Sequence, residues 1–196
     1  MPRPIDAGAM LATAQRLAGA GAGRGRPAVC DLRRATSTAY YAVFHQITRH
    51  AAITVVPGAT ERDIALAARW ITHSNVKAAC TTVIKAAAPS QAPKAESARI
   101  GLIQGGGQAG IHPDLLALAR RYIDLQRNRE LADYDNAYDP YRPVTIGHIA
   151  TAESALGNAW HLWLPNASHQ ARSNAHEQYQ RFLLLTYLGP RDTHPR

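Results

Sequence analysis

Apolar residues recur every three or four positions along most of this chain, and no segment alternates apolar and polar residues over a useful length. The pattern is clearest in residues 31–52, 113–133, 144–163 and 170–188. This spacing puts apolar side chains on one face of a helix, whereas a half-buried strand needs a period of two. We therefore predict an all-α fold, a helical bundle of about five main helices that run up and down.

The apolar positions of these segments predict the core. We expect it to include the following side chains: Tyr40, Val43, Ile47, Ile64, Leu66, Trp70, Val76, Cys80, Val83, Leu115, Leu118, Tyr122, Leu125, Ile146, Ile149, Leu156, Trp160, Trp163, Tyr179, Phe182 and Leu183. For the two tryptophans of 144–163, core or dimer contact is favoured over the stacking of nucleic-acid bases.

Glycine and proline divide the chain between these segments. A short first helix is expected at 5–19, and one broken or two short helices at 60–87. Residues 88–112 are rich in Pro, Gly and Ala without a sustained period, so we expect a flexible, irregular insertion there. Pro113 suits the first position of a helix, and His112 before it is a candidate cap. We predict a single domain over 1–196, with its core at about 31–188.

Charge and cysteine content narrow the class of protein. The 22 Lys and Arg against 14 Asp and Glu give a net charge of +8, which favours an anionic partner, nucleic acid first and an acidic protein second. Cys30 and Cys80 form neither a disulfide framework nor a metal pattern, which indicates a reducing compartment. With no signal peptide and no run of 18 apolar residues, we expect a cytoplasmic protein without a membrane segment, a metal or a cofactor.

One polar ridge accompanies the apolar stripe of 31–52. Arg34, Ser37, Tyr41 and His45 are three and four residues apart, so they share a face of that helix. A cation, a hydroxyl, a phenol and an imidazole in a row could contact a phosphodiester. They could equally pack and form hydrogen bonds with a neighbouring helix, and the spacing alone favours this second interpretation.

Two blocks of the sequence resemble the HEPN-domain family. The first is RATSTAYYAVFH at 34–45, and the second is LQRNRELADYD at 125–135. They occur in the family's order, and the resemblance covers about 31–163, interrupted by 88–112. It implies a HEPN-like helical bundle, RNA cleavage and a place in toxin–antitoxin or defence systems.

The resemblance also implies a site. Active members carry an arginine and, four to six residues later, a histidine; two protomers pair these motifs in one cleft and need no metal. Arg127 and Asn128 match the start of the motif and Tyr134 its end, but Ala132 stands where the histidine belongs. In a second register Arg129 is the motif arginine, and that register lacks the histidine too. This departure puts ribonuclease activity in question, because imidazole suits proton transfer near neutral pH.

Other residues could compensate for the missing histidine. We expect His45 to reach the cleft from 31–52, and Arg129, Arg34, Ser37, Tyr41 and Asp133 to bind the substrate. The pair Arg142 and His148 also has the motif spacing, but it lies outside the matching block, so we interpret it as coincidence. For the cations of the second block, a solvated helix end is the competing interpretation.

Tyr134 suggests a further role. In HEPN toxins with a nucleotidyltransferase antitoxin, the motif tyrosine can accept a nucleotide, and Tyr134 stands at that position. Packing against a neighbouring helix is the alternative.

Three hypotheses follow. The first is a homodimeric, RNA-directed protein that acts as a metal-independent endoribonuclease toxin with Arg127, Asn128, Tyr134 and His45 in catalysis. The second is an inactive HEPN module that binds RNA, a nucleotide or a protein such as a nucleotidyltransferase antitoxin. The third is a structural subunit of a defence or toxin–antitoxin complex.

Overall fold

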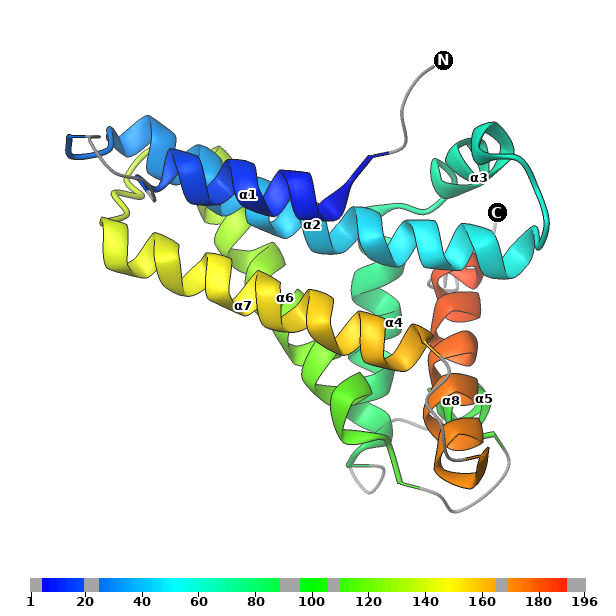
Figure 1. The fold of residues 1–196 in the computed structure, drawn as a ribbon. Helices are drawn as coiled ribbons and strands as arrows, with labels where there is room; N and C mark the ends of the chain where they lie inside the picture. Colours follow the sequence, from blue (N-terminus) through cyan, green and yellow to red (C-terminus); the bar gives the residue numbers. More distant parts are fainter. Residues whose placement is uncertain (1–4, 20–24, 89–95, 106–109, 165–168, 190–196) are drawn as a thin grey trace, which may run out of the picture. The chain divides into compact units, whose positions relative to one another are not determined.

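The computed structural model describes residues 5–19, 25–88, 96–105, 110–164 and 169–189, with the side chains of 169–173 excepted. All regular structure in these residues is helical (Figure 1). The helices are α1 (Ala7–Leu17), α2 (Val29–Val55), α3 (Glu61–Ala68), α4 (His73–Ala86), α5 (Ser97–Gln104), α6 (Pro113–Tyr134), α7 (Arg142–Trp163) and α8 (His169–Leu188). The prediction of an all-α helical bundle is confirmed.

Short polar side chains fix where several helices begin. Asp6 accepts hydrogen bonds from the backbone N–H groups of Gly8 and Ala9 at the start of α1, at 2.8 and 3.2 Å. At the start of α6, Nδ1 of His112 accepts the N–H of Asp114 at 3.3 Å, with Pro113 in the first helical position. Each contact satisfies a backbone donor that has no partner within the helix. The predicted cap at His112 is confirmed.

The chain divides into two compact units, each built from two segments. Unit 1 comprises 1–46 and 121–157, and unit 2 comprises 47–120 and 158–196. The helices α2, α6 and α7 each contribute residues to both. The expectation of one domain over 1–196 stays a prediction, and each unit is described by itself.

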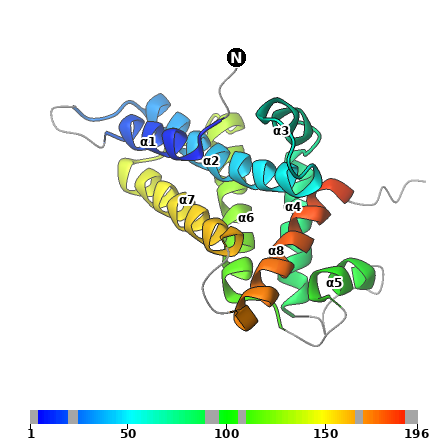
Figure 2. The same cartoon turned by 45° about the vertical axis from the view of Figure 1, so that its right-hand side comes forward.

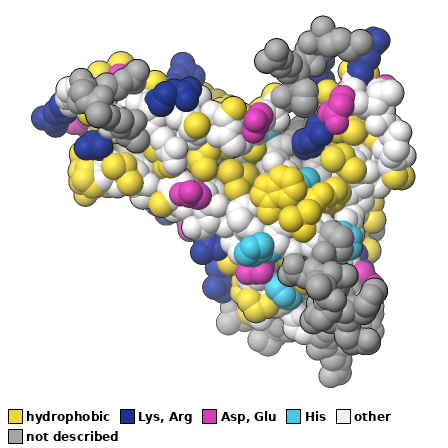
Figure 3. Space-filling model, viewed as in Figure 1, with side chains coloured by type: hydrophobic (Ala, Val, Ile, Leu, Met, Phe, Trp, Pro, Cys, Tyr) yellow, Lys and Arg dark blue, Asp and Glu magenta, His cyan; other side chains and the backbone are white. Residues whose placement is uncertain are grey.

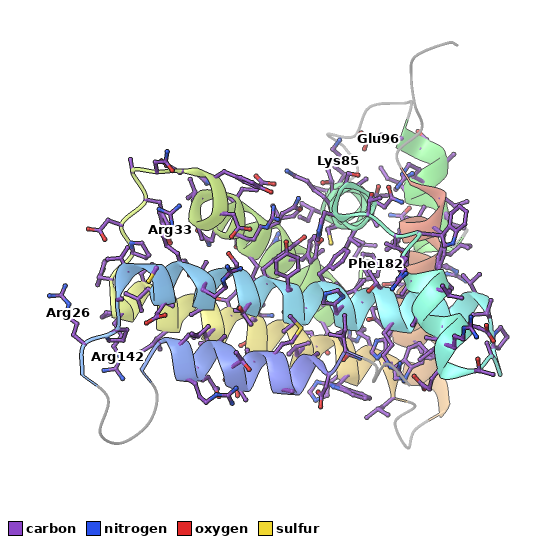
Figure 4. The ribbon with its side chains drawn as sticks, turned by 90° about the horizontal axis from the view of Figure 1, so that it is seen from above. Arg26, Arg33, Lys85, Glu96, Arg142 and Phe182 are labelled. Carbon is purple, nitrogen blue, oxygen red and sulfur yellow. The ribbon has the colours of Figure 1, made fainter. Side chains whose placement is uncertain are left out.

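The core of unit 1 is rich in alanine. Figures 1 and 4 show α1 beside the first half of α2. The buried side chains include Ala14, Leu32, Ala35, Ala39, Tyr40, Ala42, Val43, Tyr122, Leu125, Ala132, Ile149, Ala152 and Leu156. Small side chains at helix contacts let the helix axes approach closely. In this core the buried hydroxyls of Tyr40 and Tyr122 lie 2.8 Å apart in a hydrogen bond, so each satisfies the other.

In unit 2, α4 packs against both α5 and α8 (Figures 1 and 2). Its buried side chains include Ile47, Ile64, Val76, Cys80, Val83, Ile100, Ile103, Leu115, Leu118, Tyr179, Phe182 and Leu183. An ion pair between Lys85 and Glu96, 2.5 Å apart, connects α4 to the residue before α5 (Figure 4).

Part of the predicted insertion 88–112 is helical, which corrects the sequence interpretation. Ile100 and Ile103 of α5 are buried, and α5 also packs against α8. Two apolar residues on one face are enough for a short helix held by its neighbours, although they are too few to give a clear period. The described residues within 88–112 are 88, 96–105 and 110–112.

Four predicted core residues are exposed instead. Leu66 and Trp70, near the end of α3, are 46% and 79% exposed, and Ile146 and Trp160 of α7 are each 45% exposed. Each belongs to a run in which apolar residues recur every three or four positions, but this spacing shows only that they share a face. Whether another element covers that face depends on the tertiary fold.

A buried histidine is part of the aromatic core of unit 2. The ring of His50 is stacked on that of Trp163, with centroids 4.2 Å apart and planes 10° from parallel. Nδ1 of His50 is hydrogen-bonded to the hydroxyl of Tyr179 at 3.0 Å. Desolvation lowers the pKa of His50 to about 3, and the charge of Arg49 contributes to the shift. His50 is therefore neutral in the folded protein.

This burial predicts that acid destabilises the protein through His50. Its pKa lies below the unfolded value near 6.5, so the unfolded chain binds a proton that the folded chain does not. The free energy of unfolding is expected to fall by about 1.4 kcal/mol per pH unit from this group as the pH drops below 6.5. In urea titrations between pH 7.5 and 4.5, His50→Gln should show a shallower decline, and parallel declines would contradict the prediction.

Candidate functional site

Arg33 holds the end of α6 on α2 in unit 1. Its Nε donates to the carbonyl of Ala132 at 2.8 Å, and its Nη1 donates to the carbonyl of Tyr138 at 3.1 Å (Figure 4). The last carbonyls of a helix have no partner within it, and a cation there also complements the helix dipole. Sequence reasoning named Arg34 and not Arg33, although Arg33 lies four residues before Ser37 and so shares its side of the helix. The contact that organises this region comes from Arg33.

A second set of contacts joins the polar ridge of α2 to the last turn of α6. Ser37 donates to Oδ1 of Asp133, and Nη2 of Arg129 donates to the hydroxyl of Tyr41 at 2.7 Å. Nε of Arg129 forms an ion pair with Oδ2 of Asp133 at 2.7 Å, without the angle of a hydrogen bond. The guanidinium carbon of Arg129 also lies 5.1 Å from the ring centroid of Tyr134. We call Ser37, Tyr41, Arg129, Asp133 and Tyr134 the α2–α6 cluster.

The contacts of the α2–α6 cluster occupy several of the predicted substrate-binding residues. The side chains of Arg129 and Asp133 are 15% and 24% exposed, and their polar groups serve each other, Ser37 and Tyr41. An arginine held in this way has few donors left for a phosphate. Ser37 and Tyr41 thus form contacts with a neighbouring helix, as the spacing alone favoured, and substrate binding by Arg129 and Asp133 stays a prediction.

The remaining predicted residues of this region differ in exposure. Tyr134 is 71% exposed, so its ring is not part of the core, and its hydroxyl belongs to a largely solvated side chain. His45 is half-buried beside the rings of Tyr41 and Phe44, with centroids 6.1 and 5.3 Å away. Arg34 is exposed, and its side chain forms no hydrogen bond or ion pair with the described part of the chain.

A pocket of about 380 Å³ lies on another side of α6, between this helix and α7. It is lined by Asp124, Leu125, Arg127, Asn128, Leu131, His148 and Thr151. Neither Arg127 nor Asn128 forms a side-chain hydrogen bond or an ion pair with any described residue. The pocket therefore presents a guanidinium and an amide whose donors can serve a ligand.

His148 supplies an imidazole to this pocket. Its Nδ1 lies 3.2 Å from Oγ1 of Thr36, a buried residue of α2, so one ring nitrogen has a partner and the ring is oriented. Desolvation lowers the pKa of His148 below its usual value, which favours the neutral form near neutral pH. A neutral imidazole with one nitrogen held by a hydroxyl can accept a proton at the other.

The sequence interpretation of His148 has to be revised in part. Arg142 does not line the pocket; it donates to the carbonyls of Ala18 and Gly19 at 3.0 and 3.1 Å (Figure 4). The spacing of Arg142 and His148 is thus coincidental, as expected. His148 itself was missed as a partner of Arg127 and Asn128, because the two lie on different helices and no local spacing relates them.

Position 132, where the family motif has its histidine and this chain has Ala132, lies outside the pocket. This residue is 3% exposed and its carbonyl accepts the hydrogen bond of Arg33. It is not among the residues that line the pocket. A histidine at 132 would be buried in the core of unit 1.

The predicted site residues therefore fall into two groups within unit 1. Arg127 and Asn128 line the pocket, with His148 added by the structure. Ser37, Tyr41, Arg129, Asp133 and Tyr134 form the α2–α6 cluster, with His45 beside Tyr41. The predicted site residues His45, Tyr134 and Arg34 are not among those that line the pocket.

Charge is unevenly divided between the units. Unit 1 has ten Lys and Arg against eight Asp and Glu, whereas unit 2 has twelve against six. The pocket therefore belongs to the less basic unit. Any affinity for an anion there depends on local donors more than on net charge.

Comparisons with known proteins identify no family. No family model, no curated protein and no solved structure matches this chain. Among the described residues, no three His, Cys, Asp or Glu side chains are grouped so that they could hold a metal ion. No described helix combines the length and apolar character needed to cross a bilayer. The HEPN resemblance thus stays a hypothesis.

The contrast between Arg127 and Arg129 predicts that their substitutions change stability by different amounts. Arg129→Ala would leave the carboxylate of Asp133 and the hydroxyl of Tyr41 without their cation, at a cost of about 1–3 kcal/mol in the free energy of unfolding, since the group is only partly buried. Arg127→Ala removes an exposed side chain without described partners and should change stability by less than about 0.5 kcal/mol. Chemical denaturation of both variants gives the comparison, and equal losses would refute the assignment of roles.

Proposed function

We propose that the chain is an RNA-directed protein of the HEPN type, and that its pocket cleaves RNA with His148 in place of the missing motif histidine. The observation that carries this proposal is the pocket that joins Arg127, Asn128 and His148. Two of these side chains have donors without described partners, and the third is an oriented imidazole whose pKa is lowered.

The chemistry follows from the groups present. Arg127 and Asn128 would hold the phosphate through charge-assisted and neutral hydrogen bonds. The free ring nitrogen of His148 would take the proton of the ribose 2′-hydroxyl, whose oxygen attacks phosphorus. The bond from phosphorus to the 5′-oxygen then breaks, and that oxygen takes a proton from water. The products would be a 2′,3′-cyclic phosphate and a 5′-hydroxyl end.

This mechanism requires RNA as the substrate class, because DNA lacks the 2′-hydroxyl. It uses no metal ion, in keeping with the family that the sequence resembles. The same resemblance supports a cytoplasmic homodimer that acts as a toxin or in defence. In a dimer, the exposed Tyr134 and Tyr141 near the α6–α7 connection would be candidates for the contact between protomers.

A second candidate function is a HEPN module that binds without cutting. It is favoured by the burial of position 132 and by the internal use of Arg129. In this case the exposed Tyr134 would be available as the acceptor for a nucleotidyltransferase antitoxin. Mass spectrometry after incubation with such an enzyme and ATP, comparing the natural chain with Tyr134→Phe, would test that role.

The ribonuclease proposal predicts which substitutions abolish cleavage. Arg127→Ala and His148→Ala should each lower the rate of cleavage of total RNA by about a hundredfold or more, because each removes a group that acts in the transition state. EDTA should leave the rate unchanged. Gel analysis of the fragments and of their cyclic phosphate ends provides the measurement.

Matched controls come from α6. Arg120→Ala removes an exposed arginine two turns before Arg127 and should leave the rate unchanged. Asp124→Asn removes a negative charge that lines the pocket and should tighten RNA binding. Cleavage that persists in both Arg127→Ala and His148→Ala, or that EDTA abolishes, would refute the proposed mechanism.

The lowered pKa of His148 predicts the pH dependence of cleavage. A general base acts in its deprotonated form, so kcat/KM should rise with pH on the acidic side. Because the pKa is lowered, the midpoint of this rise should lie below about pH 6.5, the usual pKa of histidine, and kcat/KM should be constant at higher pH. His148→Gln should remove this acidic limb from the residual activity. An acidic limb centred above pH 7 would show that another group is the base.

A further inference from the structure

The end of α3 and the turn that follows it, in unit 2, combine basic and apolar side chains that the fold leaves uncovered. Arg62 and Leu66 lie in α3, Arg69 is its C-terminal cap, and Trp70 is the next residue, in the turn after the helix. All four are exposed, Trp70 by 79% and Leu66 by 46%. We call these four residues the α3 face. Figure 3 shows basic side chains in the region of α3, at the upper right.

Contacts on the other side of α3 fix this orientation. Ile64 is buried, and Thr60 caps the helix by accepting the N–H of Asp63. Both carboxylate oxygens of Glu61 accept hydrogen bonds from Arg49 of α2, at 2.7 and 2.9 Å. The carboxylate of Glu61 is therefore engaged by Arg49, and that of Asp63, three residues before Leu66, accepts the hydroxyl of Thr60 at 2.7 Å. The four residues of the α3 face carry two positive charges.

The side chains of the α3 face have no partners in the described part of the chain. The guanidinium groups of Arg62 and Arg69 form no hydrogen bond or ion pair there, and the ring of Trp70 contacts no other ring. Tryptophan is highly buried on average, so an indole exposed to this degree indicates a surface that receives a ligand. The high net charge of unit 2 favours an anionic one.

We propose that the α3 face binds single-stranded nucleic acid. A base would stack on the indole of Trp70, and phosphates on either side of it would be bound by Arg62 and Arg69. An exposed indole near the end of α3 together with two exposed guanidinium groups suits a strand in which bases and phosphates alternate. A duplex fits less well, because its bases are already stacked. This binding does not require that the pocket of unit 1 cuts RNA.

The test uses the full chain with Arg127→Ala as the common background, so that neither cleavage nor the pocket arginine contributes. A fluorescein-labelled oligouridine of about twelve nucleotides is titrated at several KCl concentrations, and the anisotropy gives the dissociation constant. In this background Trp70→Ala should weaken binding about tenfold. The double substitution Arg62→Ala and Arg69→Ala should reduce the slope of log K against log salt by about 1.4, since each phosphate that is no longer neutralised accounts for about 0.7.

Two controls match these variants in exposure. Leu188→Ala removes an apolar side chain that is 60% exposed on α8, and Arg120→Ala removes an exposed arginine of α6. Both should bind oligouridine as the background does. The substituted residues are exposed, so melting temperatures should agree to within a few degrees.

Two results would overturn the proposal. One is equal affinity for oligouridine in the background, Trp70→Ala and the double variant, as expected if the α3 face docks on a protein instead. The other is a loss of the same size in Leu188→Ala. Cleavage by the chain with Arg127 intact is measured separately, so a failed pocket mechanism would leave this result unchanged.

Discussion

The arrangement of unit 1 depends on how the last turn of α6 is held on α2. Arg33 binds the carbonyl of Ala132 in the last turn of α6 and that of Tyr138 beyond the helix. One and two turns further along α2, Ser37 and Tyr41 bind Asp133 and Arg129. These contacts fix the rotation of α6 about its own axis. That rotation decides which of its polar side chains meet α2 and which meet the pocket beside α7.

Arg127 and Arg129 show the consequence of this fixed rotation. They are two residues apart, so they project from different sides of α6. Arg129 is enclosed by Tyr41, Asp133 and Tyr134, whereas Arg127 has no described partner and lines the pocket with His148. One sequence block therefore contains a structural arginine and a free one. A motif read without the fold cannot tell them apart.

Helix type, several helix ends and much of the core could be predicted from the sequence, because they depend on local rules. Two features of α6 follow from such local rules: the cap at His112, where the helix begins, and its end at Tyr134. The site could be predicted only in part: Arg127 and Asn128 were found through one continuous block, but His148 comes from another helix. The exposure of Trp70 was missed for a related reason, since nothing in the period of a helix says whether its apolar face is covered.

The division of α2, α6 and α7 between two compact units has a practical consequence for anyone who would study them apart. Each unit combines two distant stretches of polypeptide, so neither can be expressed as one continuous piece of the natural gene. A cut at any of the three joints would sever a helix in its interior and expose backbone donors and acceptors that the intact helix pairs. Isolating a unit would require a new linker between its two stretches and fresh capping residues at the severed ends.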